Sequence, residues 1–244
     1  MSYCLLSIVT VTKNCAATIG RTLASVVAIK VPGIEYIVVD GVSSDDTLDI
    51  VRSHGALVDY LISEPDTGIY NAMNKGAQLA NGRYVLFING DDELVSDGFP
   101  EVIRAMEKNE AEIINASTLV GDCANYSEVL VAKPWRLPFF NSIPHPSAFV
   151  SANLLRRLPF REDLRIVSDY DFFLRAYLQG CKFQVLPVVT ALHKRGGASG
   201  NVAASVMELE QVRRERLGWR YPVTNAIAGL YRFGKRLVRR CVNA

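Results

Sequence analysis

The chain has 244 residues, about half of them hydrophobic, which is enough for one large domain or for a domain with an appendage. The net charge of +2 conceals an asymmetry, because residues 213–240 carry nine Arg or Lys and one acid, about +8, and the remainder is therefore near −6. Five cysteines without CxxC spacing exclude a disulfide scaffold, and the lack of a run of about 18 apolar residues excludes a membrane-spanning helix. No secretory signal is recognisable at the N-terminus, so we expect a cytoplasmic protein.

The first half of the chain alternates predicted strands and helices. β-Branched and aliphatic runs predict buried strands at residues 5–12, 35–39, 60–63 and 84–88. Helices are predicted between them at residues 18–29, 43–55 and 69–80. This order predicts an α/β fold with a mostly parallel, doubly wound sheet, in which ligands bind beyond the carboxyl ends of the strands.

Polar residues stand at four of those predicted strand ends: Thr12, Asp40, Ser63–Glu64 and Asp91–Asp92. The last pair forms part of Asn89–Gly90–Asp91–Asp92, and two carboxylates in this place are hard oxygen ligands that suit Mg²⁺ or Mn²⁺. A divalent ion there could bind the oxygens of a diphosphate. The alternative is an acidic turn, since Gly–Asp–Asp is also good turn chemistry.

The segment from Ser63 to Gly76 shapes a loop before the third predicted helix. Asp66, Asn71, Asn74 and Lys75 are polar groups near the start of that helix, a place that suits anion binding. Each of them, taken singly, is more often part of a solvated helix face. Asp66 and Lys75 are nevertheless candidate donor-binding residues.

The second half of the chain is less regular. A helix is predicted at residues 101–108, a strand pair at 112–120 and 127–131, a helix at 169–179 and a strand at 183–189. Asp169 is either the N-cap of its helix or a general base. His145 lies between two prolines and could contact a sugar, and His193 could ligate a metal or bind phosphate, although a lone histidine is more often structural.

The set of motifs resembles glycosyltransferase family 2. The matching pieces are Ser7–Asn14, Val39–Thr47, Ser63–Gly76, Asn89–Asp92 and Asp169–Asp171, and they span roughly residues 4 to 200. The resemblance implies the GT-A fold, with a nucleotide-binding first half and an acceptor-binding second half. It is closest in pattern to bacterial members that build capsules, exopolysaccharides or lipopolysaccharide.

The resemblance also implies roles for individual residues. Thr10 to Thr12 and Asp40 would hold the nucleotide, with Asp91 also on the donor side. Asp92 and Asp91 would bind Mn²⁺ or Mg²⁺, and Asp92 is the preferred ligand because Asn89 replaces the first Asp of the family's metal motif. Asp169 matches the catalytic base, with Asp171 as the alternative base or an acceptor-binding residue.

The expected activity is inverting transfer of a sugar from a nucleotide-diphosphate sugar to a saccharide or lipid-linked acceptor. We expect a transferase domain at residues 1–200 and a basic amphipathic helical segment at 201–244, which either lies on an anionic membrane or packs on the domain. No nucleic-acid partner is expected, since the basic residues are confined to this tail. The alternatives are a nucleotidyltransferase and a non-catalytic nucleotide-sugar or membrane-binding protein of the same fold.

Overall fold

The computed structural model describes residues 4–122, 125–194 and 202–242. Its first half confirms the predicted alternation of strands and helices. The elements are β1 (Leu6–Thr12), α1 (Ile19–Val27), β2 (Ile34–Asp40), α2 (Thr47–Ser53), β3 (Tyr60–Ser63), α3 (Ile69–Leu79) and β4 (Tyr84–Asn89). Strand β1 pairs in parallel with β2 and with β4, and β2 pairs in parallel with β3, so the carboxyl ends of all four lie at one edge.

The second half converts this parallel sheet into a mixed one. Its elements are β5 (Glu93–Leu94), α4 (Phe99–Lys108), β6 (Ile113–Asp122), β7 (Asn125–Leu130), β8 (Ala148–Ser151), α5 (Ala152–Arg157), α6 (Ser168–Leu178) and β9 (Phe183–Lys194). The strand order is β3-β2-β1-β4-β8-β6-β9-β5, with β7 added on β6. The predicted hairpin is confirmed as β6 and β7. Strand β8, only four residues long, was not predicted, and it runs antiparallel to both β4 and β6.

Each face of the sheet carries its own hydrophobic core. Helices α1 and α4 cover one face, with Leu23 and Val102 fully buried, and α3, α5 and α6 cover the other, with Met73 and Phe172 buried. All seven residues of β1 are buried, and successive side chains alternate between the two cores. This explains why β1 is a continuous apolar run in the sequence rather than an alternating one.

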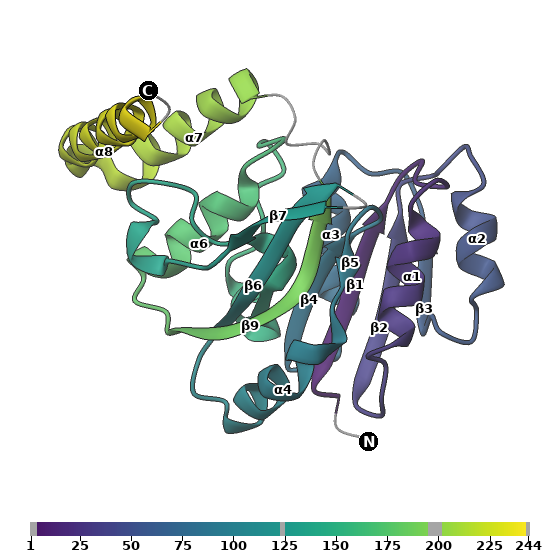
Figure 1. Cartoon of the computed structure of the whole chain (residues 1–244). Helices are drawn as coiled ribbons and strands as arrows, with labels where there is room; N and C mark the ends of the chain where they lie inside the picture. Colours follow the sequence, from purple (N-terminus) through teal and green to yellow (C-terminus); the bar gives the residue numbers. More distant parts are fainter. Residues whose placement is uncertain (1–3, 123–124, 195–201, 243–244) are drawn as a thin grey trace.

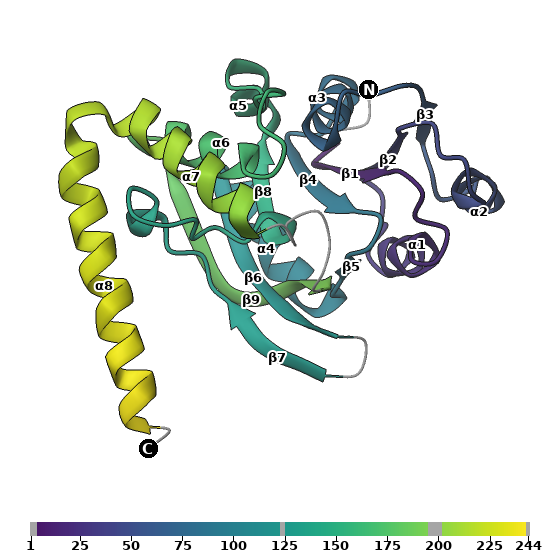
Figure 2. The same cartoon turned by 90° about the horizontal axis from the view of Figure 1, so that it is seen from above.

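Two helices follow the sheet: α7 (Val202–Leu217) and, after the short turn Gly218–Arg220, α8 (Tyr221–Val242). Helix α7 packs on the domain beside α6, and its Val212 and Leu217 join the core. Helix α8 lies outside the domain, at the edge formed by α7 (Figures 1 and 2). Among the described residues, none of the helices combines the length and the apolar character needed to cross a membrane.

Gly76 permits the close packing of α3 on β1. A Cβ atom at this position would lie 2.3 Å from Cγ1 of Val9, inside a core where neither element can move freely. We expect Gly76→Ala to lower the free energy of unfolding by about 1–3 kcal/mol through overpacking. Thermal unfolding followed by circular dichroism measures this change.

Gly20→Ala is the matched control, because a Cβ added at Gly20 in α1 meets no atom within 4 Å. This substitution should leave stability unchanged or raise it by about 0.5–1 kcal/mol, since alanine favours the helix. Equal destabilisation by the two substitutions would contradict the packing argument.

Candidate active site

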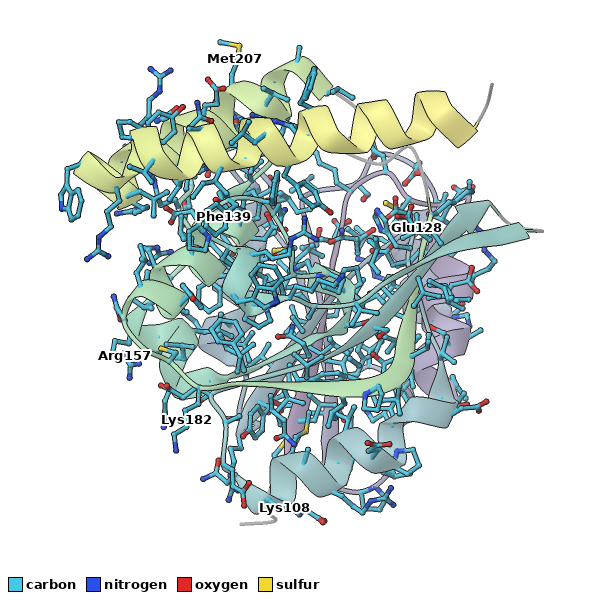
Figure 3. The ribbon with its side chains drawn as sticks, turned by 60° about the vertical axis from the view of Figure 1, so that its left-hand side comes forward. Lys108, Glu128, Phe139, Arg157, Lys182 and Met207 are labelled. Carbon is cyan, nitrogen blue, oxygen red and sulfur yellow. The ribbon has the colours of Figure 1, made fainter. Side chains whose placement is uncertain are left out.

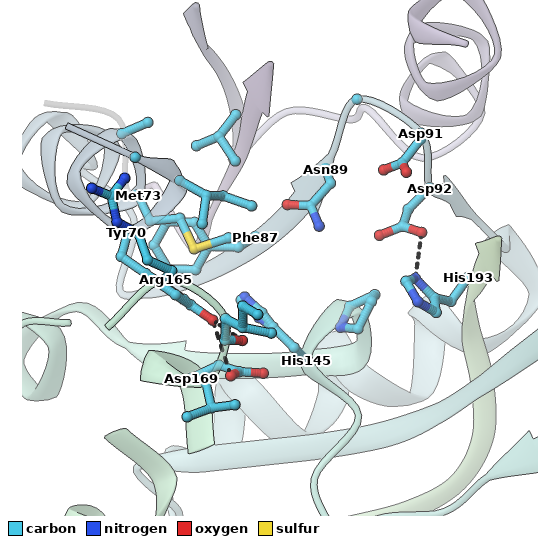
Figure 4. A pocket seen from close by; sticks show the side chains of 18 of the residues that line it. Tyr70, Met73, Phe87, Asn89, Asp91, Asp92, His145, Arg165, Asp169 and His193 are labelled. Atoms are coloured by element: carbon cyan, nitrogen blue, oxygen red, sulfur yellow. Dashed lines mark hydrogen bonds and ion pairs between the residues drawn. The ribbon is translucent and has the colours of Figure 1, made fainter. Parts of the chain in front are cut away.

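A cavity of about 900 Å³ opens at the carboxyl ends of β1 and β4. One wall comes from these strand ends and from the start of α3. The other comes from the loop before β8, the start of α6 and one face of α7 (Figure 4). The lining includes Val11–Lys13, Asp66–Tyr70, Asn89–Asp92, Ile143–Pro146, Arg165–Val167, Asp169, His193, Ser205 and Leu209. The cavity therefore lies where the strand order predicts a ligand site.

Helix α1 holds the acidic loop Gly90–Asp92 in place. The hydroxyl of Thr18 donates to the carbonyl of Gly90 at 2.7 Å, and that of Thr22 donates to the carbonyl of Asp92 at 2.7 Å. Arg21 forms an ion pair with Glu93 at 2.9 Å. Residues three and four apart share one helix face, so a single face of α1 fixes the whole loop.

Asp92 is fully buried and pairs with His193, which lies near the end of β9. The distance from His193 Nδ1 to Asp92 Oδ1 is 2.7 Å (Figure 4). This hydrogen bond is the main cause that raises the pKa of His193. In the neighbouring residue Asp91, burial raises the pKa of the carboxyl group, and the negative charge of Asp92 adds to the effect.

The chemistry of this pair fits a divalent cation. Among the described residues, no hydrogen-bond partner reaches the buried second oxygen of Asp92, Oδ2, or the buried Oδ1 of Asn89. A carboxylate and an imidazole are ligands that Mn²⁺ accepts, and Mg²⁺ is commonly held by one or two carboxylates together with substrate phosphates. Within the described residues no group of three or more His, Cys, Asp or Glu side chains forms a complete cage.

Asp169 lies across the cavity at the start of α6. Its Oδ1 accepts a hydrogen bond from the hydroxyl of Tyr70 at 3.2 Å, and the same hydroxyl donates to the carbonyl of Ile166 at 2.7 Å (Figure 4). Burial, followed by the charge of Asp169, raises the pKa of Tyr70, so the tyrosine stays protonated and acts as a donor. The carboxylate is thus oriented from α3 and still faces the cavity.

Glu208 of α7 fixes the loop that leads into Asp169. Its carboxylate accepts backbone N–H groups from Arg165 at 2.9 Å, Ile166 at 2.9 Å and Val167 at 3.1 Å. The first N–H groups of a helix have no hydrogen-bond partners within the helix, so they need acceptors from elsewhere. Glu208 therefore ties the segment before α6 to α7.

His145 lies between the two walls (Figure 4). Its ring stacks on Phe87 with 5.9 Å between centroids and an angle of 17°. Both ring nitrogens are buried and have no hydrogen-bond partner in the described part of the chain. Burial lowers the pKa of His145, so the ring is neutral at neutral pH. A neutral imidazole offers one donor and one acceptor to a bound molecule.

Comparison with known proteins assigns the chain to a family. The model for glycosyl transferase family 2 matches residues 7–177, which is more than half of the chain. The chain belongs to glycosyltransferase family 2. A PGL/p-HBAD biosynthesis glycosyltransferase of Mycobacterium bovis is 28% identical over 242 residues, covering 97% of this chain and 93% of the relative.

The chain is also similar to a second relative, over a shorter stretch, and to two solved structures. WfaP of Escherichia coli, a UDP-Glc:alpha-D-GlcNAc-diphosphoundecaprenol beta-1,3-glucosyltransferase, is 32% identical over 104 residues, 42% of this chain and 41% of WfaP. TarS of S. aureus, solved with UDP-GlcNAc, has a TM-score of 0.70 at 18% identity, covering 89% of this chain and 73% of TarS. The mannosyltransferase PcManGT of Pyrobaculum calidifontis, solved with GDP-Man and Mn²⁺, has a TM-score of 0.66 at 20% identity, covering 86% and 63%. These structures show that the transferase has the GT-A fold.

Most of the predicted site residues of the transferase line the cavity. Thr12, Asp66, Asp91 and Asp92 lie on the wall formed by the strand ends and the start of α3, and the lining also includes Asp169, His145 and His193. The hydroxyl oxygen of Thr12 is buried and has no hydrogen-bond partner among the residues that the structure describes, and Asp66 accepts the backbone N–H of Gly68 at 3.0 Å. These residues come from both halves of the chain and meet only in the folded protein.

Two predicted nucleotide-binding residues do not line the cavity. Thr10 is buried within the sheet, where its hydroxyl oxygen accepts the hydroxyl of Tyr36 at 2.9 Å. Asp40 is also fully buried, and it accepts the backbone N–H of Ser43 at 2.9 Å and the hydroxyl of Ser63 at 2.8 Å. The Ser43 hydroxyl contacts the same carboxylate. Asp40 therefore shapes the loop after β2.

Lys75 and Asp171 likewise have structural partners and do not line the cavity. Lys75 binds the carbonyl of Pro65 at 2.7 Å and Glu64 at 2.8 Å, which fastens the loop to α3. Asp171 is fully buried, and Arg175 and Arg216 each approach it to 2.7 Å. Because the helix turns by about 100° per residue, Asp171 points away from the cavity that Asp169 faces. Asp171 is therefore placed to hold α6 and α7 together through its arginine partners.

Sequence reasoning missed three residues of the site. Tyr70 belongs to a motif that was recognised, but its contact with Asp169 spans 99 positions of sequence. Arg165 lines the cavity and donates to the carbonyl of Thr67 at 3.3 Å. Glu208 stood in the tail that was treated as an appendage. No local pattern marks these residues, because their partners are distant in the sequence.

Glu208→Gln should slow the transferase without unfolding it. The amide retains one oxygen acceptor and turns an NH₂ group toward a backbone N–H, so the loop before Asp169 loses its fixed position. We expect kcat to fall by about tenfold or more, since small displacements of a catalytic group are costly. Nucleotide binding, measured by thermal shift, should remain close to that of the unchanged protein.

Glu210→Gln is the matched control on the same helix, because within the described residues Glu210 forms an exposed ion pair with Arg214 at 3.6 Å. This variant should retain full activity. An equal loss of kcat in both variants, or a loss of nucleotide binding in Glu208→Gln, would argue against a specific role in placing Asp169.

Proposed function

We propose that the protein transfers one sugar from a nucleoside diphosphate sugar to a hydroxyl of a lipid-linked saccharide, with inversion at the anomeric carbon. One observation carries this proposal. Asp169 and the Asp92–His193 pair stand on opposite walls of one cavity, with the unpartnered His145 between them (Figure 4). In this arrangement the base can act on the attacking hydroxyl while the diphosphate site acts on the leaving group of the same displacement.

The donor would bind along the wall formed by β1, β4 and the start of α3. Thr12 and Asp66 would contact the nucleoside, and Asp91 and Asp92 would lie at the diphosphate. Asp92 and His193 would hold Mn²⁺ or Mg²⁺, which when bound neutralises negative charge on the leaving diphosphate. Asp92 Oδ2, buried and without a partner, supports this assignment, because a cation would satisfy it.

Asp169 would accept the proton of the acceptor hydroxyl as that oxygen forms its bond to the anomeric carbon. The bond from the anomeric carbon to the diphosphate oxygen breaks in the same step, and the diphosphate leaves with the electron pair. The hydrogen bond from Tyr70 orients the carboxylate. A single in-line displacement inverts configuration, whereas retention by two displacements requires a second, nucleophilic carboxylate. The other carboxylates of the described lining, Asp66, Asp91 and Asp92, are assigned to the donor side.

A lipid-linked acceptor is supported by two observations. The name of WfaP specifies a GlcNAc-diphosphoundecaprenol acceptor. In this chain Arg165 lines the same cavity as Asp169 and would pair with an acceptor diphosphate.

The described cysteines Cys4, Cys15 and Cys181 are free thiols, which supports a reducing compartment. We therefore place the reaction on the cytoplasmic side, at the membrane that holds the acceptor.

A thermal-shift screen tests the donor site. UDP, GDP, dTDP and CMP are each added with Mn²⁺ or with EDTA, and binding raises the melting temperature by mass action. We expect a metal-dependent shift with one nucleoside diphosphate. Asp92→Ala should abolish the metal-dependent part, whereas Asp97→Ala, an exposed carboxylate after the same loop, should not. No shift with any nucleotide, from a folded sample, would favour a non-catalytic protein of the same fold.

Asp169→Asn tests the base. The amide keeps the size of the side chain and removes its basicity, so we expect transfer to fall by about 10²- to 10⁴-fold while the nucleotide-induced shift persists. Asp171→Asn should instead lower the melting temperature, because it removes the buried charge that pairs with the half-buried Arg175 and Arg216. Loss of transfer from a stable Asp171→Asn protein, with Asp169→Asn still active, would show that the wrong carboxylate was chosen.

A further inference from the structure

Helix α8 presents a row of large apolar side chains to solvent. Trp219, just before the helix, is 82% exposed, and Val223, Ile227, Leu230 and Phe233 are 60%, 47%, 73% and 62% exposed. The positions 223, 227 and 230 recur at helical spacing and so share one face of α8. Scattered apolar residues are common on protein surfaces, but a contiguous row of this kind marks a contact surface.

The opposite side of α8 makes the contacts with the domain. Ala228 is fully buried, and the ring of Tyr221 lies under the guanidinium groups of Arg213 and Arg214, at 5.4 and 5.3 Å. Figures 2 and 3 show the helix extending along the outside of the domain. The apolar row is therefore not part of the protein core: it faces outward from a helix that is already anchored.

The charge of α8 indicates what the apolar row contacts. Residues 221–242 include five Arg or Lys and no Asp or Glu. Pairing with a second copy of the same helix would bring like charges together with no acidic partners between the helices. An anionic lipid surface complements this composition, since interfacial helices combine an apolar face with a Lys- and Arg-rich polar face.

We propose that α8 lies flat in the surface of an anionic bilayer, with its apolar row inserted among the lipids. A helix of 22 residues is about 33 Å long at 1.5 Å per residue. Its five cations exclude a spanning orientation and favour one parallel to the membrane. Trp135, 65% exposed, lies next to Arg136, whose guanidinium group is 4.8 Å from the ring of Tyr231 on α8, so a second aromatic residue stands beside the helix.

This surface is connected to the active site through α7. Ser205 and Leu209 of α7 line the cavity, and the chain then turns through Gly218 into α8. A docked α8 would hold the cavity wall formed by α7 near the membrane, where a lipid-linked acceptor has its saccharide. In this respect the inference rests on the proposed function, although the docking itself needs neither donor nor acceptor.

Intrinsic fluorescence measures the docking directly, because the only two tryptophans are Trp135 and Trp219. In full-length Trp135→Phe, Trp219 is the single tryptophan fluorophore. Vesicles of phosphatidylglycerol should shift its emission to shorter wavelength, and vesicles of phosphatidylcholine should do so much less. Added salt should weaken the effect, because it screens the attraction between the cations and the lipid. No shift with phosphatidylglycerol, from a folded protein, overturns the proposal.

Leu230→Asp with Phe233→Asp, in the same background, should reduce the affinity for phosphatidylglycerol vesicles by about tenfold or more, since affinity grows with the apolar area inserted. Val27→Asp is the control, because Val27 is similarly exposed, at 56%, but lies on α1 at the far side of the domain (Figure 1). Equal loss in both variants would overturn the proposal.

Two further measurements distinguish lipid docking from self-association and from a defect in the active site. Light scattering gives the mass without lipid, and a dimer that the α8 variant converts to a monomer, with vesicle binding unchanged, would show that the row binds a second copy instead. The nucleotide thermal shift gives the state of the active site. Vesicle binding without a nucleotide shift would disprove the proposed function alone, and a nucleotide shift without vesicle binding would disprove the docking alone.

Discussion

The buried carboxylate of Asp92 needs partners for both of its oxygens, and the rest of the site depends on how that need is met. One of its oxygens bonds to His193 and the other is buried without a partner. A buried polar group left unpaired costs about 1–3 kcal/mol, and more when it is charged. The threonines of α1 hold the backbone of the loop, so the carboxylate cannot turn away to water. A bound cation would satisfy such a group, and this is the role that we propose for Asp92.

The two walls of the cavity are stabilised from different parts of the chain. The wall formed by β1, β4 and α3 uses parallel strand ends, where neighbouring loops meet, and its acidic loop is held by the hydroxyls of Thr18 and Thr22. The wall with Asp169 needs support from outside α6, which comes from Tyr70 of α3 and Glu208 of α7. The ion pair between Arg216 and Asp171 binds α7 to α6 a second time. Helix α7 is thus a structural part of the site as well as the start of the basic tail.

The basic tail divides into two parts with different environments. Arg213 is buried against the domain and Arg216 pairs with Asp171, so these charges are used for packing. Arg220 and Arg232 are exposed, in the same part of the chain as the outward apolar row of α8. Composition alone treats all of these arginines alike, because a run of positive charge does not reveal which side chains find acidic partners elsewhere in the fold.

The sequence by itself determined the strand and helix order of the first half, the Asn89–Asp92 loop at a strand end and Asp169 at a helix start. These features follow from hydrophobic periodicity and from local motifs, which the chain carries regardless of distant contacts. Only the tertiary structure decided which polar residues face the cavity. The fold gives structural partners to four of the predicted site residues, namely Thr10, Asp40, Lys75 and Asp171. It also brings together Asp92 and His193, which are 101 positions apart in the sequence. Which side chains interact depends on how strands and helices that are distant in the sequence pack together, and no local pattern encodes that packing.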